Sequence, residues 1–88
     1  LIRAAIRESR KLRIDYQDAK GSSTTRTIWP LGLYLFSHVT MIGAWCEVRG
    51  DYRAFRTERV KGCRPMDERF NGRHGTMMAE FVARFQSQ

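Results

Sequence analysis

The feature that most limits the fold of this chain is a series of strand-length runs separated by turn residues. "LRIDYQ" (12–17) alternates apolar and polar residues, which predicts a half-buried strand. A β-branched run over 24–36 predicts a second strand, which Pro30 should end or bend because proline cannot donate to a sheet ladder. Residues 39–48 are apolar on both faces, which is typical of a central or strongly curved strand. Short strands with close turns predict a mainly β domain built on a strongly bent sheet or small barrel.

The second half of the chain continues the pattern. Gly50-Asp51 stands between two strand-like runs and predicts a two-residue hairpin turn, followed by a short strand over about 52–57. Residues 59–64 indicate a last short strand that Pro65 stops. Residues 66–74 are expected to connect this strand to a final helix.

Helical periodicity appears at both ends of the chain. Residues 1–12 predict a helix with a narrow apolar stripe and a solvated basic face. Residues 75–88 predict a helix with a broader stripe of Met77, Met78, Phe81, Val82 and Phe85. Two interpretations of the second stripe stay open. It packs on the chain's own sheet, which we favour, or it forms a partner or dimer surface, where Met and Phe are frequent.

The charge of this small domain is concentrated in its first part. The 88 residues carry a net charge of +7, with 13 Lys/Arg and six Asp/Glu in residues 1–65 but three of each in 66–88. This distribution favours an anionic partner for the first part, against the alternative of a merely soluble basic surface. No apolar run approaches the roughly 18 residues of a membrane helix, and no signal peptide is recognised, so we expect a cytoplasmic protein.

Residues that could carry catalysis are sparse, so we expect no enzyme and no cofactor. Cys46 and Cys63 are expected to be reduced thiols, because a zinc site joining them to His38 and His74 fits no familiar spacing. Ser37 and His38, as adjacent strand residues, would point to opposite faces and not form a nucleophile–base pair. We interpret His38 as a loop histidine or a polar ligand contact.

The arginines around Phe55 are better candidates for function. In a strand, Arg53 and Phe55 share a face and Arg56 lies on the other. If Phe55 lies in the core, Arg53 on the same face must lie at the open end of the strand (its mouth). There its planar guanidinium could reach a phosphate or carboxylate. Arg26 could join from a neighbouring strand, and the direction of Arg59 is undetermined. The alternative is that Arg53, Arg56 and Arg59 partly hold the nearby acids Glu47, Asp51 and Glu58.

The combined pattern resembles the WYL domain of bacterial transcriptional regulators. The matching positions are Arg26, Pro30-Leu31, the segment "AWCEVR" (44–49), the segment "RAFR" (53–56), Arg59 and Val60, and Tyr16 also fits. The resemblance covers about residues 1–65. The triplet Trp-Tyr-Leu that names the family is replaced here by Thr40-Met41-Ile42, which puts in question ligand contacts that need an aromatic side chain there.

The resemblance implies an Sm-like, SH3-type β-barrel in residues 1–65, with 66–88 as a linker and helix that start a C-terminal extension used in dimerisation. It implies an effector-sensing domain that binds a nucleotide or single-stranded nucleic acid. Its regulator would form a homodimer and contact promoter DNA through a helix-turn-helix domain that this chain lacks. We expect the ligand-binding residues to be Tyr16, Arg26, His38, Arg53, Arg56 and Arg59. Two rivals are a structural dimerisation module without a ligand and direct duplex DNA binding through the basic barrel.

Overall fold

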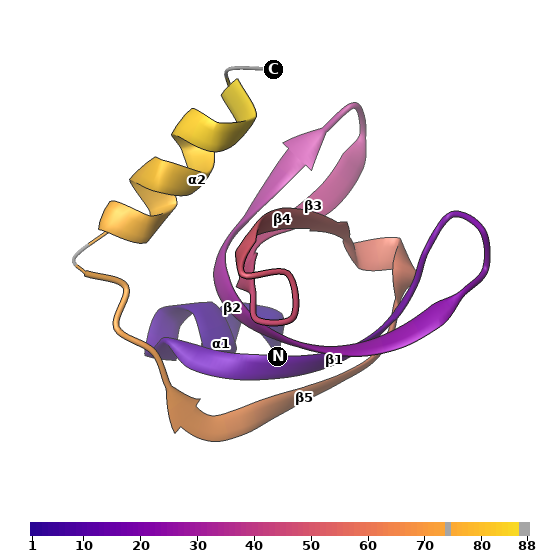
Figure 1. Cartoon of the computed structure of the whole chain (residues 1–88), viewed down its shortest axis with the longest axis horizontal. Coiled ribbons are helices and arrows are strands. Elements are labelled where there is room, and N and C mark those ends of the chain that lie inside the picture. The colour runs from indigo at the N-terminus through magenta and orange to yellow at the C-terminus, as the bar shows by residue number, and fades with distance from the viewer. Residues whose placement is uncertain (74, 87–88) are drawn as a thin grey trace.

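The chain folds into one curved antiparallel sheet with a helix at each end (Figure 1). The computed structural model describes residues 1–73 and 75–86. Its elements, in chain order, are α1 (Ile2–Glu8), β1 (Arg10–Gln17), β2 (Ser23–Phe36), β3 (Val39–Cys46), β4 (Asp51–Arg56), the 3-10 turn η1 (Thr57–Arg59), β5 (Val60–Arg69) and α2 (Thr76–Gln86). The predicted mainly β class, with one helix at each end, is confirmed.

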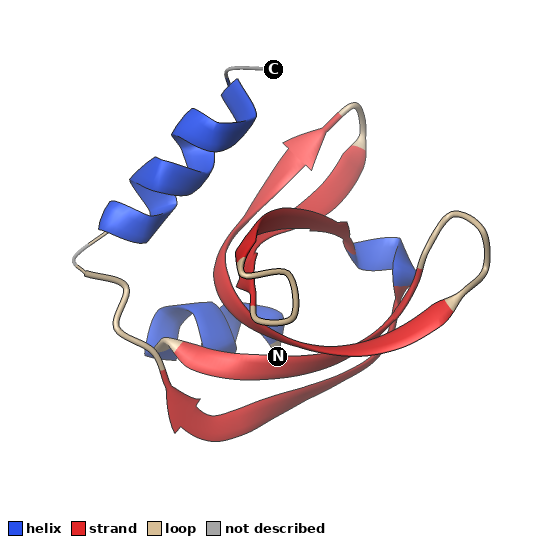
Figure 2. Cartoon of the chain, in the orientation of Figure 1, coloured by secondary structure: helices blue, strands red, loops and turns tan. Residues whose placement is uncertain are grey.

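The five strands lie in the order β4-β3-β2-β1-β5. Among the described residues, β4 pairs with β3 and β5 pairs with β1, and the short turn η1 connects these two edge strands. Figure 2 shows the strands curling around a common interior, with α2 outside the curl. Closure into a complete barrel stays a prediction.

The core fills the concave face of this sheet. In β1 the buried residues are Leu12, Ile14 and Tyr16, as the alternation predicted. The neighbouring strands add fully buried side chains to the same cluster, namely Ile28, Ile42, Ala44, Cys46 and Phe55, and α1 contributes Ala5. A single apolar cluster of this kind is what an 88-residue domain can bury, and it fixes the register of each strand.

Pro30 bends β2 but does not end it. The strand continues to Phe36, and its pairing with β3 shifts register between Pro30 and Gly32. β3 lies between β2 and β4, which confirms the prediction of a central strand. The apolar face predicted for residues 39–48 is wrong at its end, because β3 stops at Cys46 and Val48 is 75% exposed in the following turn.

The predicted two-residue hairpin at Gly50-Asp51 is also wrong. The turn between β3 and β4 spans Glu47 to Gly50, and the Gly50 amide donates to the Cys46 carbonyl at 2.8 Å. Glu47 stays with β2 because its amide donates to the Thr27 carbonyl at 3.2 Å. Gly50 has φ +62, a left-handed conformation that glycine adopts without strain.

Two element boundaries differ from the prediction for local reasons. The first helix ends at Glu8, and not near residue 12, because Ser9 takes a left-handed conformation and Arg10 begins β1. The last strand does not stop at Pro65 but continues to Arg69. Pro65 is tolerated because β5 is an edge strand, where a missing amide donor can face solvent.

α2 packs on the outer face of the sheet. Met77 and Phe81 are each 4% exposed, and two glycines provide the space that the helix needs. A Cβ at Gly43 would lie 2.7 Å from Phe81 Cζ, and one at Gly32 would clash with the end of Met78. The predicted packing of the stripe on the chain's own sheet is confirmed for these residues. A second role as a partner surface stays a prediction. In residues 1–73 and 75–86, neither helix has the length and apolar character to cross a bilayer.

Candidate anion-binding site

Arg26 and Arg53 lie at one end of the concave core face. In the strand pairing, Arg26 is opposite the buried Ile14 and Arg53 is opposite the buried Ala44, so both side chains start from the core side of the sheet. Arg26 donates through Nη1 to Cys46 Sγ at 3.7 Å and through Nε to Thr24 Oγ1 at 3.0 Å. These contacts hold the Arg26 guanidinium at the edge of the core.

The Arg53 guanidinium lies over the Phe55 ring, 5.3 Å from its centroid. Phe55 is fully buried, so Arg53 continues the same face of β4 outward from the core. The sequence predicted that Arg53 and Phe55 could share a face of the strand only if Arg53 lies at the mouth of the strand. The position of Arg53 beyond the buried Phe55 agrees with this prediction. A cation over an aromatic face is favourable and keeps the guanidinium in a fixed position.

A third arginine, Arg49, adds to the positive charge at this end. Burial lowers the pKa of Arg53, and the nearby Arg49 and then Arg26 guanidiniums lower it further. We call Arg26, Arg49 and Arg53 the basic mouth. Within residues 1–73 and 75–86, no carboxylate forms an ion pair with any of the three. The Asp51 carboxylate interacts with Arg49 and offsets part of this positive charge, and a bound anion would offset more of the mutual repulsion.

Arg49 was not among the residues expected from the sequence to bind a ligand. Arg49 lies in the four-residue β3–β4 turn, whose start is set by the hydrogen bond from the Glu47 amide to the Thr27 carbonyl. The alternation of apolar and polar residues in the sequence cannot show this contact. The signal that could have found it is its place at the end of the "AWCEVR" segment, two residues from the strand that carries Arg53.

Arg56 has a different environment from Arg53. Its Nη2 lies 2.5 Å from Glu58 Oε1, and its Nε is buried without a hydrogen-bond partner. Arg59 is half-buried in η1. The alternative role as holders of nearby acids is thus correct for Arg56 and Glu58. The other two acids have other partners. Glu47 pairs with Lys11 at 3.0 Å, and Asp51 pairs with Arg84 at 2.6 Å.

Tyr16 and His38 lie in contrasting positions. Tyr16 is 5% exposed, meets the Phe55 ring edge-on at a centroid distance of 5.0 Å, and accepts a hydrogen bond from the Arg56 amide at 3.1 Å. Its ring is therefore part of the core beneath the mouth. His38 is exposed with φ +67 in the β2–β3 turn, beside Ser37 with φ +51. The pair belongs to a turn and not to a strand, which corrects the strand-based argument and confirms the interpretation of His38 as a loop histidine. The ligand roles of Tyr16, His38, Arg56 and Arg59 stay predictions.

The cysteines are not paired with each other. Cys46 is buried in the core, and burial raises the pKa of the half-buried Cys63 thiol. His74, which the zinc hypothesis required, lies outside the described residues. Among those described, no group of three or more His, Cys, Asp and Glu side chains could hold a metal ion.

A strongly curved antiparallel sheet with arginines gathered at one end defines a small, mainly β domain. The WYL domain family matches residues 1–65, and the chain belongs to this family. The chain is also similar to the solved structure of proteasome accessory factor B/C (PafBC) of Arthrobacter aurescens, with 33% sequence identity and a TM-score of 0.76. The similarity covers 85% of this chain and 12% of that chain. No curated protein matches the chain. Family membership and the likeness to PafBC support a regulatory role.

Proposed function

We propose that this chain is the effector-sensing part of a bacterial transcriptional regulator. In this proposal it binds the phosphates of a nucleotide or of single-stranded nucleic acid at the basic mouth. The WYL match supports the regulatory class. The observation that supports an anionic ligand is the position of Arg53, which is partly buried, faces two other arginines and has no acidic partner among the described residues.

The arginines of the basic mouth suit phosphate binding better than mobile arginines on an open surface would. Arg26 and Arg53 are held in place by Cys46, Thr24 and Phe55, so less side-chain entropy is lost when a ligand binds. Planar guanidiniums can form paired hydrogen bonds to phosphate oxygens. Regulation would follow if the ligand bound two arrangements of the whole regulator with different affinity.

The test is a titration of fluorescently labelled short single-stranded oligonucleotides and of cyclic dinucleotides into the 88-residue chain. We expect saturable binding that weakens with salt and is lost in the variants Arg26→Gln and Arg53→Gln. Arg64→Gln is the matched control, because Arg64 lies in β5 and pairs with Asp15 at 3.6 Å. Binding that is equal in all variants would refute a site at the mouth. Preference for duplex DNA would favour direct promoter contact.

A second candidate function, dimerisation, is favoured by an apolar groove beside α2. The groove has a volume of about 680 Å³, and Phe36, Met41, Val82 and Phe85 are among its lining residues. Leu35 and Phe36, at the end of β2, are 70% and 67% exposed. Exposed apolar side chains of this size are typical of interaction surfaces. Mass measurement over a range of concentrations tests this function, with Phe36→Ser as the variant. A monomer at every concentration would exclude it.

A further inference from the structure

A second cavity lies on the opposite face of the sheet from the basic mouth. Trp29, Trp45 and Tyr52 occupy neighbouring positions on β2, β3 and β4, since Trp29 pairs with Trp45 and Trp45 pairs with Tyr52. The Trp29 and Trp45 rings are 6.2 Å apart, and the Trp45 and Tyr52 rings meet edge to face at 5.0 Å. These three residues form an aromatic row across the outer face.

The aromatic row borders a cavity of about 450 Å³. The other side of the cavity is formed by the connection after β5 and the first turns of α2, which contribute Arg73 and Glu80. Both tryptophans of the chain line this cavity. Asn71 and Met77 complete the lining, so the walls combine parts of three aromatic rings with the Arg73 guanidinium and the Glu80 carboxylate. The Trp29 ring already stacks on Phe70 at 5.4 Å and has Lys11 Nζ 5.1 Å from its centroid, so the more open aromatic surfaces are those of Trp45 and Tyr52.

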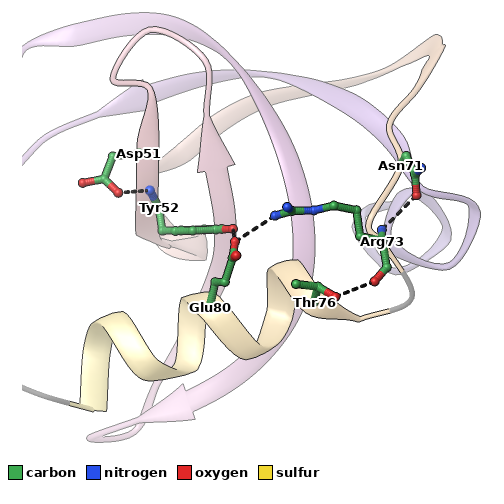
Figure 3. Close-up of polar contacts among 6 residues, drawn as sticks. All are labelled: Asp51, Tyr52, Asn71, Arg73, Thr76 and Glu80. Atoms are coloured by element: carbon green, nitrogen blue, oxygen red, sulfur yellow. Dashed lines mark hydrogen bonds and ion pairs between the residues drawn. The ribbon is translucent and has the colours of Figure 1, made fainter.

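The charged groups at the rim already form a cation–carboxylate contact. Glu80 Oε1 accepts hydrogen bonds from the Tyr52 hydroxyl and from Arg73 Nη2, the latter at 2.9 Å (Figure 3). The side chains of Arg73 and Glu80 are 54% and 46% exposed. The backbone of Arg73 is held separately, because Asn71 Oδ1 accepts its amide at 2.9 Å and Thr76 Oγ1 donates to its carbonyl at 2.7 Å. The Arg73 side chain can therefore leave Glu80 without a change in the path of the chain.

We propose that this cavity is a binding site for an organic cation, and that Arg73 occupies its rim in the absence of a ligand. Aromatic faces carry negative electrostatic potential and attract ammonium and guanidinium groups, and a nearby carboxylate adds to the attraction. Glu80 would oppose an anion at the same place, so this site differs in chemistry from the basic mouth. A quaternary ammonium or guanidinium would take the position beside Glu80 and the aromatic row.

The test uses the intrinsic fluorescence of the 88-residue chain, because both tryptophans lie at the cavity. The probe is choline, compared at constant ionic strength with its neutral isostere, in which a tert-butyl group replaces the trimethylammonium group. The proposal expects a saturable signal with choline and little or none with the neutral compound. Equal signals from both would show an apolar cavity without cation recognition. No signal from either would also overturn the proposal.

Two variants separate recognition from a purely structural contact. Arg73→Ala removes the internal competitor and should tighten choline binding severalfold, which the loss of a structural contact would not do. Glu80→Gln should weaken binding severalfold, and Arg64→Ala, in β5 and not among the residues that line the cavity, should leave it unchanged. Circular dichroism checks that α2 remains folded in each variant. If α2 is unfolded in Glu80→Gln, the test of cation recognition is the choline affinity of Arg73→Ala. Unchanged or weaker binding in Arg73→Ala would overturn the proposal.

Discussion

The hydrogen bond from Tyr52 to Glu80 gives a prediction whose size can be worked out from the structure. The variant Tyr52→Phe removes only the hydroxyl and keeps the ring contacts with Trp45 and Phe81. A hydrogen bond to a charged group contributes roughly 1.5–3 kcal/mol when well shielded. Glu80 is 46% exposed, so solvent screening reduces the expected loss to about 1 kcal/mol. For a domain of this size, about 1 kcal/mol lowers the melting temperature by roughly 4–8 °C.

The same contact predicts a dependence on alkaline pH. Burial, together with Glu80, raises the pKa of Tyr52 to about 12. In the unfolded chain a tyrosine ionises near pH 10, so the unfolded state loses its proton first. The stability that this group contributes is therefore fully present below about pH 10 and is lost as the pH rises towards about 12. The difference in unfolding free energy between the wild type and Tyr52→Phe should shrink over this range.

Thermal and urea unfolding followed by circular dichroism, at a series of pH values, measures both effects. Tyr34→Phe is the control, because burial alone raises the pKa of Tyr34 and its hydroxyl makes no hydrogen bond within the described residues. We expect that variant to match the wild type at neutral pH. A Tyr52→Phe variant as stable as the wild type at neutral pH, or a difference that stays constant up to pH 12, would refute the reasoning.

Three further predictions follow from the packing and the charges. Gly43→Ala places a Cβ about 2.7 Å from Phe81 Cζ, so α2 should become sensitive to limited proteolysis while the sheet persists, and an α2 as resistant as in the wild type would contradict this. Phe55→Ala empties a fully buried position and should cost about 3–5 kcal/mol in urea unfolding, and a loss below about 1 kcal/mol would show that Phe55 is not central to the core. Arg53→Gln relieves repulsion from Arg49 and Arg26, which salt screens, so without a ligand its melting temperature should fall less than that of the wild type when the salt concentration is lowered, and equal decreases would contradict the repulsion.

The sequence predicted well those parts of the fold that depend on local alternation. The buried row of Leu12, Ile14 and Tyr16 follows from period-two patterning, and the central position of β3 follows from its two apolar faces. Pro65 was misinterpreted because the edge position of β5 depends on long-range pairing. The β3–β4 turn was misinterpreted because the contacts of Glu47 with β2 decide where β3 ends.

The candidate site was predictable only in part. Because a buried Phe55 shares a face with Arg53, the sequence predicted Arg53 at the mouth of the strand. The resemblance to the WYL domain predicted a role for Arg26. Arg49 could not be placed without the length of its turn. The burial of Tyr16 and the loop position of His38 agree with the sequence interpretation, but the edge-on contact of Tyr16 with Phe55 depends on packing between distant strands, which a linear pattern does not contain. The aromatic row across three strands likewise required the strand register.

We propose that Arg26, Arg49 and Arg53 form an anion site, in which none of the three forms an ion pair with a carboxylate of the described residues. The most direct test measures the melting temperature in sodium pyrophosphate and in sodium chloride at equal ionic strength. A ligand that binds only the folded state raises the apparent stability with its concentration. We expect pyrophosphate to stabilise the wild type more than chloride does, and we expect this difference to disappear in Arg53→Gln but to persist in Arg64→Gln. Equal stabilisation of the wild type by the two salts, or an unchanged pyrophosphate effect in Arg53→Gln, would contradict the proposal.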